Sequence, residues 1–329
     1  MQNPRNSTPT ITLSVELEDP NDPNDPENEK INNEKQTKAT IELIERRVVV
    51  ISILIPFSII GALIRVKLTN WHSYQEAPVF SQIYPQFVGC VIMGFCLSRK
   101  NFIMERYLPL YFGLTIGLCG SITTFSSWIL LTIKLLINYP NNYSNGQNVL
   151  ASLAAIGITI GMSVSGLRFG EHLGDFILSS QRFKSTNLHK ISTKPFNLKE
   201  LSVIDWIIVG FSTFVRLWLS RYNRITKFFP IGTFAANILG STILGILYLL
   251  GHGTISSNTG CDLISSGLAD GFCGCLTTIS TFAAEITTLP KKRAYAYALS
   301  STITALVIVT LIVGSYNWKI GLSNTCEIF

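Results

Sequence analysis

Long apolar segments dominate this chain and limit most strongly how it can fold. A helix needs roughly 20 mostly apolar residues to cross the hydrocarbon core of a bilayer. Eight segments of the 329-residue chain come close to that length. We expect spans near residues 47–68, 79–98, 109–137, 148–167, 202–220, 230–250, 262–287 and 295–316. The sequence therefore predicts an all-α, multi-pass membrane protein.

Composition agrees with a location in the lipid bilayer. Hydrophobic residues make up 47% of the chain and charged residues only 14%. The net charge is +6, but lysines and arginines fall between the apolar segments instead of forming one basic motif. We therefore expect contact with lipid and no nucleic-acid partner.

The two ends of the chain lie outside the predicted spans. Residues 1–45 are acidic, contain Pro20, Pro23 and Pro26, and lack apolar periodicity. Such a composition is typical of a disordered tail. Residues 321–329 form a short C-terminal tail.

The cysteines do not form a metal or redox motif. None of the seven cysteines stands in the CxxC spacing of such sites. Cys261 and Cys326 lie outside the spans and are the candidate disulfide pair, if both face an oxidising compartment.

The chain contains an internal repeat of two four-helix halves, residues 46–168 and 202–320. The third spans agree best: Gly117–Trp128 reads GLCGSITTFSSW and Gly271–Phe282 reads GFCGCLTTISTF. Shorter matches in the same order pair Arg65 with Arg216 in the first spans and Gln86 with Asn237 in the second spans. Three motifs in one order indicate a duplication.

Basic residues beside the spans predict that the two halves are inverted. Such residues favour the cytoplasmic side. Arg46 precedes the first span and Arg168 follows the fourth, so the first half starts and ends inside. In the second half the basic loops 221–227 and 291–293 are expected inside, so this half starts and ends outside.

The linker between the halves leaves this topology open. Inverted halves need an odd number of crossings between them, and residues 169–201 contain no apolar run long enough for a span. Phe169–Ser180 is short and carries Glu171, His172 and Asp175, which would be costly in a bilayer. The expected crossing helix is therefore not evident.

Both third spans place glycines and consecutive hydroxyl residues at mid-membrane. These residues favour a break in the helix, and broken backbone at that depth persists only where it lines a cavity or binds something. The freed carbonyls can hold a small cation, and hydroxyl or amide donors can replace the water shell of a small anion. The alternative is that small residues only allow close helix packing. Duplication of the pattern favours an ion site.

These residues resemble the fluoride channel family known as Fluc or CrcB in bacteria and FEX in fungi, whose third helix carries G-x-x-G-x-x-T-T-F-S-T-F. The second half also carries the family motif G-T-F-x-A-N-x-x-G as Gly232–Gly240. The resemblance covers nearly all of residues 47–320, and two halves in one chain are similar to the eukaryotic, fungal branch. It implies passive fluoride export, fluoride resistance, a plasma-membrane location and function as a single fused chain.

The resemblance also implies a structural sodium ion between the halves. Its ligands would be the backbone carbonyls of Gly120, Thr123, Gly274 and Thr277.

The pores of the family are lined by the two phenylalanines of T-T-F-S-T-F, contributed to each pore by opposite halves. In this chain one pore would receive both rings, while the other would receive a tryptophan and an isoleucine. The resemblance thus implies one working pore and one vestigial pore. The working pore would contain Phe125, Phe282, Asn237, Ser301 and Thr304, and the vestigial pore Gln86, Trp128 and Ile279. Without the family pattern, the large apolar residues would be read as core packing.

Three ionisable residues at span positions are functional candidates, because charge is costly there. Arg65, Arg216 and Glu285 are expected in the vestibules of the pores, and Glu285 resembles a vestibule carboxylate of the family. The alternatives are that both arginines extend to the membrane interface and that Glu285 is simply solvated.

Passive conduction needs no pump chemistry, and the chain has no Walker motif. A competing interpretation is a proton-coupled secondary transporter, which would need a titrating carboxylate at mid-membrane. A pore-dead structural homologue is the alternative if the linker does not cross. An enzyme is disfavoured, because no nucleophile, base and orienting residue are grouped.

Overall fold

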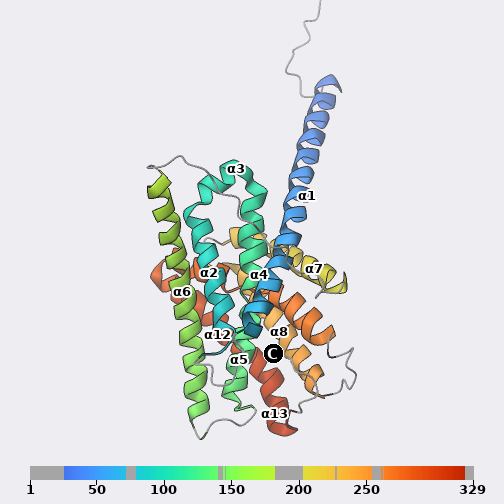
Figure 1. Ribbon diagram of the computed structural model, residues 1–329. Helices are drawn as coiled ribbons and strands as arrows, with labels where there is room; N and C mark the ends of the chain where they lie inside the picture. The colour runs from blue at the N-terminus through green and yellow to red at the C-terminus, as the bar shows by residue number, and fades with distance from the viewer. Residues whose placement is uncertain are drawn as a thin grey trace, which may run out of the picture. The chain divides into compact units, whose positions relative to one another are not determined.

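The computed structural model describes residues 26–71, 79–139, 144, 146–181, 203–226, 228–253, 261 and 263–322, and in these residues all regular structure is helical. The chain divides into Met1–Val48 and Val49–Phe329, and the larger unit contains both repeats (Figure 1). The predicted all-α architecture is confirmed for the described residues.

The first half is built from the elements α1 (Pro26–Trp71), α2 (Ile83–Ser98), α3 (Lys100–Phe112), the π-helical η1 (Gly113–Cys119), α4 (Gly120–Ile122), α5 (Phe125–Leu136) and α6 (Gln147–Gln181). The second half follows with α7 (Val203–Ser220), the 3₁₀ turn η3 (Arg221–Arg224), α8 (Ile231–Gly253), the π-helical η4 (Leu263–Cys273), α10 (Gly274–Leu276), α11 (Ser280–Thr288), α12 (Lys291–Val309), the π-helical η5 (Thr310–Gly314) and α13 (Ser315–Lys319). The third span of each half is thus divided into short helices, as expected.

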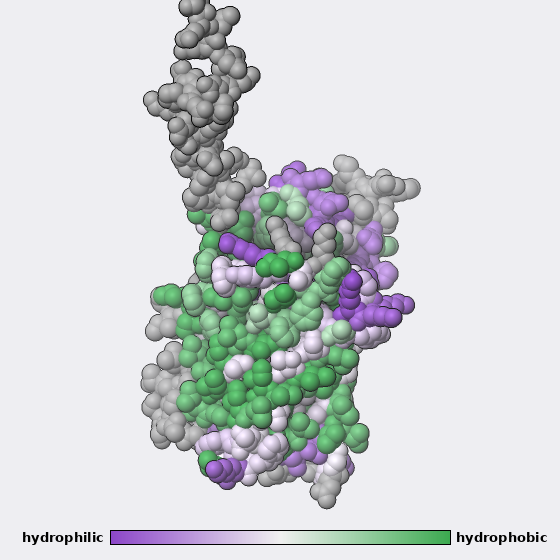
Figure 2. Space-filling model, turned by 180° about the vertical axis from the view of Figure 1, so that it is seen from behind, coloured by the Kyte–Doolittle hydropathy of each residue, from purple (hydrophilic) through white to green (hydrophobic). Residues whose placement is uncertain are grey.

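Within the part of the chain that the structure describes, five helical stretches are long and apolar enough to cross a bilayer: Val48–Trp71, Lys100–Leu136, Gln147–Ile177, Ile231–His252 and Lys291–Lys319. They coincide with the first, third, fourth, sixth and eighth predicted spans. The other three predicted spans correspond to the shorter α2, to α7, and to the broken segment from η4 to α11. On the face seen in Figure 2, hydrophobic residues form a band between hydrophilic regions above and below it.

The third spans run from the break toward opposite ends of α8. Glu285 on α11 accepts a hydrogen bond from Thr233 near the start of α8, whereas Lys134 on α5 lies over the ring of Tyr248 near the end of α8. Equivalent segments of the two halves therefore point in opposite directions, which is the inverted arrangement.

In the first half α2 packs along α6 at backbone contact distance (Figure 1). A Cβ atom on Gly94 would overlap the carbonyl oxygen of Leu167, and one on Gly170 would overlap that of Val91. Small residues allow such close approach between membrane helices. The second half is looser at this point, because a Cβ on Gly245 of α8 would lie 3.5 Å from Val309 Cγ1.

Two predicted boundaries differ from the structure. α6 continues to Gln181, and its 35 residues correspond to about 52 Å of helix, well beyond the roughly 30 Å hydrocarbon core. Phe169–Ser180 therefore extends α6 and does not form a separate crossing helix. Residues 182–202 lie outside the described residues, so the crossing between the halves stays a prediction.

At the N-terminus, helix α1 begins at Pro26, within the segment expected to be disordered. Residues 31–47 are rich in the good helix formers Glu, Lys and Arg and contain no Pro or Gly. Residues 1–25 lie outside the described residues.

Cys261 is disulfide-bonded, and Cys326, its expected partner, lies outside the described residues. The cysteines Cys90, Cys96, Cys119, Cys273 and Cys275 are free and buried.

Candidate ion-conducting site

Each third span is interrupted at a threonine pair. Thr123 has φ −94° and ψ 142°, and Thr277 has φ −89° and ψ 157°, so both are extended. The chain becomes helical again at Phe125 in the first half and at Ser280 in the second. The predicted helix breaks are confirmed.

Each half caps the helix that follows the break in the other half. The Thr123 hydroxyl accepts hydrogen bonds from the backbone N–H groups of Ile279 and Ser280 at 3.3 and 3.0 Å. The Thr277 hydroxyl accepts from Phe125 and Ser126, both at 3.2 Å. Helix N-termini leave backbone donors unsatisfied, and a hydroxyl cap satisfies them. The two breaks therefore form one structural unit.

Two amide side chains hold the backbone at the breaks. Gln86 donates from Nε2 to the Thr124 carbonyl at 2.7 Å and accepts from the Thr124 N–H at 3.3 Å. Asn237 makes the same pair of bonds with Thr278, at 3.2 and 2.9 Å. Because both amides bind the break equally, the difference in length between Gln and Asn does not by itself distinguish the two predicted pores.

In a continuous helix each backbone N–H donates to the carbonyl four residues earlier. At the two breaks, four N–H groups donate to side chains instead. Thr124 and Thr278 donate to the amides, and Ser127 and Thr281 donate to threonine hydroxyls at 3.4 Å. The carbonyls that lose their helical donors are those of Gly120, Thr123, Gly274 and Thr277. They are the four carbonyls that the resemblance assigns to sodium, and neutral hard oxygens of this kind fit such an ion.

The two arginines lie at the breaks and not in vestibules. Arg65 is 3% exposed and Arg216 is 5% exposed. A Cβ on Gly274 would overlap the Arg65 guanidinium, and a Cβ on Gly120 would overlap that of Arg216. Each arginine thus contacts the break glycine of the opposite half. The alternative, that they extend to the membrane interface, is wrong as well, because both guanidinium groups are buried against the broken helices.

Those carbonyls accept hydrogen bonds from both guanidinium groups. Arg65 donates from Nη1 to the Ser121 carbonyl at 2.6 Å and from Nη2 to the Asp270 carbonyl. Arg216 donates from Nη2 to the Ile116 carbonyl. Buried cations need such partners.

Asp270 is a site residue that the sequence analysis missed. Its carboxylate lies 3.9 Å from Arg65 Nη2. An acidic residue inside a predicted span was the available signal, but Asp270 stands one residue before the repeat motif, which begins at Gly271. The equivalent residue in the first half is Ile116. Among the described residues, Arg216 consequently makes no ion pair.

The two phenylalanines expected in the working pore meet. The rings of Phe125 and Phe282 are 5.3 Å apart and nearly perpendicular, at 74°. Phe282 also lies 5.3 Å from Tyr297 of α12. All three side chains are buried, so aromatic edges from both halves gather beside the break.

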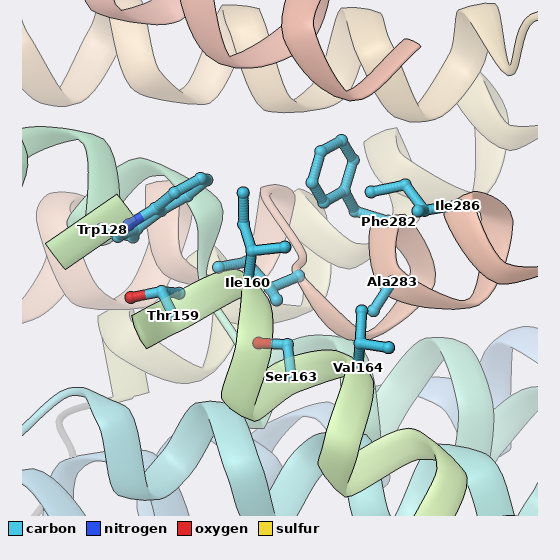
Figure 3. Close-up of a pocket in the computed structure, with 9 residues that line it drawn as sticks. Trp128, Thr159, Ile160, Ser163, Val164, Phe282, Ala283 and Ile286 are labelled. Carbon is cyan, nitrogen blue, oxygen red and sulfur yellow. The ribbon is translucent and has the colours of Figure 1, made fainter. Parts of the chain in front are cut away.

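Trp128 and Ile279, expected in the vestigial pore, also come together, at a narrow cavity against α6 (Figure 3). Its volume is about 10 Å³, close to the roughly 10–15 Å³ that one water needs. Thr159 and Ser163 of α6 line this cavity and were not predicted. Phe282 lines it as well, so this ring lies at both predicted pores.

Glu285 lies in a hydrogen-bonded cluster at the end of the aromatic site. Its carboxylate accepts from Thr233 at 2.6 Å, from Asn223 at 3.2 Å and from Tyr297 at 2.7 Å. The sequence analysis did not identify these three partners. The equivalent position in the first half is Leu131.

The last span contributes buried hydroxyls. Ser301 is fully buried, and its hydroxyl has no hydrogen-bond partner among the described residues. Thr304 is only partly buried, whereas the hydroxyl of Thr302 is buried without a described partner. Thr302, which was not predicted, is thus better enclosed than Thr304.

Both halves match a known protein family. Residues 52–167 and 206–316 match the family described as CrcB-like protein, Camphor Resistance (CrcB). The chain is similar to "Fluoride export protein 1" of Candida albicans, with 31% identity over 340 residues, 89% of this chain and 87% of the relative. The similarity to "Fluoride export protein 1" of Schizosaccharomyces pombe is 29% over 296 residues, 80% of this chain and 95% of the relative.

A bacterial relative matches only part of the chain. "Fluoride-specific ion channel FluC 2" of Moorella thermoacetica is 35% identical over 116 residues, which are 32% of this chain and 91% of that protein. No solved structure matches the chain. The bacterial relative thus has about the length of one of the two halves.

Proposed function

The chain belongs to the CrcB-like protein family, and on that premise we propose that it is a passive, fluoride-selective channel that exports fluoride from the cytoplasm and confers fluoride resistance. The contact between Phe125 and Phe282 beside the shared helix breaks is the observation that supports this best. The electropositive edge of an aromatic ring can face an anion, and buried hydroxyl donors can replace its water shell.

The voltage across the membrane supplies the driving force. A cell interior that is negative drives an anion outward, with roughly 2.3 kcal/mol per charge for each 100 mV. The Arg216 guanidinium, which has no carboxylate partner among the described residues, adds positive charge near the path. No chemical step on a substrate is needed, so the protein acts as a channel and not as an enzyme.

One of the two pores works, and the other is vestigial. Trp128 and Ile279 face a cavity with room for about one water, and the first half has Leu131 where the second has Glu285. The chain is fused, so a single copy would contain the whole path. We place it in the plasma membrane, because export requires crossing the outer boundary of the cell.

A sodium ion between the halves is part of the proposal. The carbonyls of Gly120, Thr123, Gly274 and Thr277 would hold it, and the bound ion would add positive charge between the breaks. We expect purified protein to unfold at a higher temperature in sodium chloride than in N-methylglucamine chloride. Equal melting temperatures at all sodium concentrations would contradict the ion site.

Fluoride efflux from liposomes tests the function. The purified full chain is reconstituted with fluoride inside and a potassium ionophore to set the voltage, and efflux is followed with a fluoride electrode. We expect rapid efflux of fluoride and none of chloride. Chloride efflux at a similar rate, or no fluoride efflux, would refute the proposal.

Asp270 supports a second candidate, a proton-coupled carrier. It supplies the carboxylate within a span that such a mechanism needs, and this carboxylate lies 3.9 Å from Arg65 Nη2. Fluoride movement driven by a pH gradient at zero voltage would favour this carrier over the channel.

A further inference from the structure

Helix α8 carries a buried row of polar residues along its whole length, which we call the α8 stripe. Successive polar residues on it are four, four, seven and four positions apart, which keeps them on one side of a helix. All are at most 5% exposed: Thr233, Asn237, Ser241, Tyr248 and His252. Polar side chains inside a membrane span are costly and face other polar groups or an ion path.

The chain itself uses three of these groups, including His252, whose Nδ1 lies 2.9 Å from the Tyr248 carbonyl oxygen. Thr233 donates to Glu285, and Asn237 holds the backbone of Thr278. The hydroxyls of Ser241 and Tyr248 are different, because both are buried without a hydrogen-bond partner among the described residues. A buried donor without a protein partner indicates a partner that is not protein, such as water or an ion.

The stripe leads from an acidic end to a basic end. Thr233 contacts Glu285, and Tyr248 lies with its ring 5.7 Å from Lys134 Nζ and 4.0 Å from the His252 ring. Fifteen residues separate Thr233 from Tyr248, which is about 22 Å of helix. The stripe therefore covers most of a bilayer core of roughly 30 Å.

The helices beside α8 carry the working aromatic site. α8 packs against α5, which contributes Phe125, and against α12, which contributes the unpartnered hydroxyl of Ser301. The stripe therefore runs beside the helices that carry the aromatic pair, from Asn237 at the break to Tyr248 beside Lys134.

The first half has no equivalent stripe. In the alignment that pairs Gln86 with Asn237, the positions of Ser241 and Tyr248 are occupied by Cys90 and Leu97. Hydroxyls at these two positions therefore occur only in the half that also holds Glu285 and Phe282. This asymmetry is independent of the aromatic substitutions.

We propose that the α8 stripe forms the part of the fluoride path beyond the aromatic pair, and that the Tyr248 hydroxyl donates a hydrogen bond to the ion in a second binding site. Ser241 serves as an intermediate donor. Lys134 supplies positive charge at the end of the path. The inference rests on the proposed function and adds a site to it.

Tyr248→Phe tests the inference, because it removes only the hydroxyl and keeps the ring against Lys134 and His252. In the liposome assay with the full chain, we expect fluoride efflux at least about tenfold slower, which corresponds to about 1.4 kcal/mol in the barrier. The matched control is Tyr295→Phe, since Tyr295 is 69% exposed on α12, and its efflux should equal that of the unmodified chain. Ser241→Ala should slow efflux less than Tyr248→Phe.

The outcomes separate the inference from the function. No fluoride efflux from the unmodified chain would refute the proposed function. Normal efflux from Tyr248→Phe, with the unmodified chain active and Phe282→Ile impaired, would overturn the stripe alone. If Tyr248→Phe fails to elute as a folded protein, Lys134→Gln decides: slower efflux, with the loss largest at low fluoride, supports the path, and unchanged efflux overturns it.

Discussion

The two sides of the shared helix break have nearly the same backbone but different side chains against it. Thr123 and Thr277 cap each other's helices, and Gln86 and Asn237 hold equivalent backbone groups. Around this common frame, the second half adds Asp270 and Glu285, where the first half has Ile116 and Leu131. Backbone architecture was thus retained in both halves, while these two carboxylates occur only in the second half.

The distance between packed helices also differs between the two halves. α2 and α6 of the first half meet at backbone distance through Gly94 and Gly170, which leaves little room between them. α8 and α12 are farther apart at the equivalent point, where a Cβ on Gly245 would lie 3.5 Å from Val309 Cγ1. The first half is therefore packed more tightly than the second at this helix pair.

The largest difference should appear when the two arginines are removed. Arg65→Met leaves the Asp270 carboxylate without its guanidinium, and breaking one partner of a buried ion pair destabilises a protein by about 3–5 kcal/mol. Arg216→Met removes a cation that has no carboxylate partner among the described residues, so it should lower stability less. Thermal unfolding of the purified variants in detergent measures both.

The variant pair Arg65→Met with Asp270→Asn serves as the control. Removing both charges should recover part of the stability that Arg65→Met loses. Equal destabilisation by Arg65→Met and Arg216→Met, with no recovery in the double variant, would show that the ion pair does not distinguish the halves.

The next largest effect should be on fluoride efflux, when Phe282 of the working pore is replaced by an aliphatic residue. Phe282→Ile gives the second half an aliphatic residue at the pore position, and we expect efflux at least about tenfold slower, the effect of about 1.4 kcal/mol in the barrier. Ile279→Val is the matched control and should leave efflux nearly unchanged. A larger loss in Ile279→Val than in Phe282→Ile would reverse the assignment of the two pores.

The sequence predicted the spans and the break because each depends on a local pattern. Long apolar runs report membrane crossing, and a repeated G-x-x-G-x-x-T-T reports a break at one depth. The pairing of Phe125 with Phe282 was predicted only through the family resemblance, which assigns the two rings of each pore to opposite halves. These features were therefore accessible without coordinates.

The arginines could not be placed in the same way. A guanidinium near the end of a span can reach the interface or the interior, and only the coordinates show that carbonyls of Ser121 and Ile116 are nearer. The continuation of α6 to Gln181 was also missed, because Glu171 and Asp175 end the apolar run but do not end the helix. A hydropathy pattern shows which part of a helix lies in lipid, but it does not show where the helix ends.

A smaller effect is expected from the two amides. Asn237→Ala and Gln86→Ala each leave one buried N–H and one carbonyl at a break without a partner, which should destabilise by about 1–3 kcal/mol per group. Stability should fall by similar amounts in both, since both bind the break in the same way. Fluoride efflux should fall more in Asn237→Ala, which also interrupts the α8 stripe. If the two variants differed in stability but had equal fluoride efflux, the proposal that both amides support the fold and only Asn237 serves conduction would be wrong.

The smallest change should come from restoring aromatic residues to the vestigial side. Trp128→Phe combined with Ile279→Phe gives both pores two phenylalanines, and a second open path can at most double the conductance, a change worth only about 0.4 kcal/mol in rate. We expect less than doubling, because Cys90 and Leu97 still stand where Ser241 and Tyr248 line the other path. Full doubling in single-channel or liposome measurements would mean that the rings alone define a pore. Unchanged conductance would instead indicate that the hydroxyl stripe, and not the aromatic pair, separates the two halves.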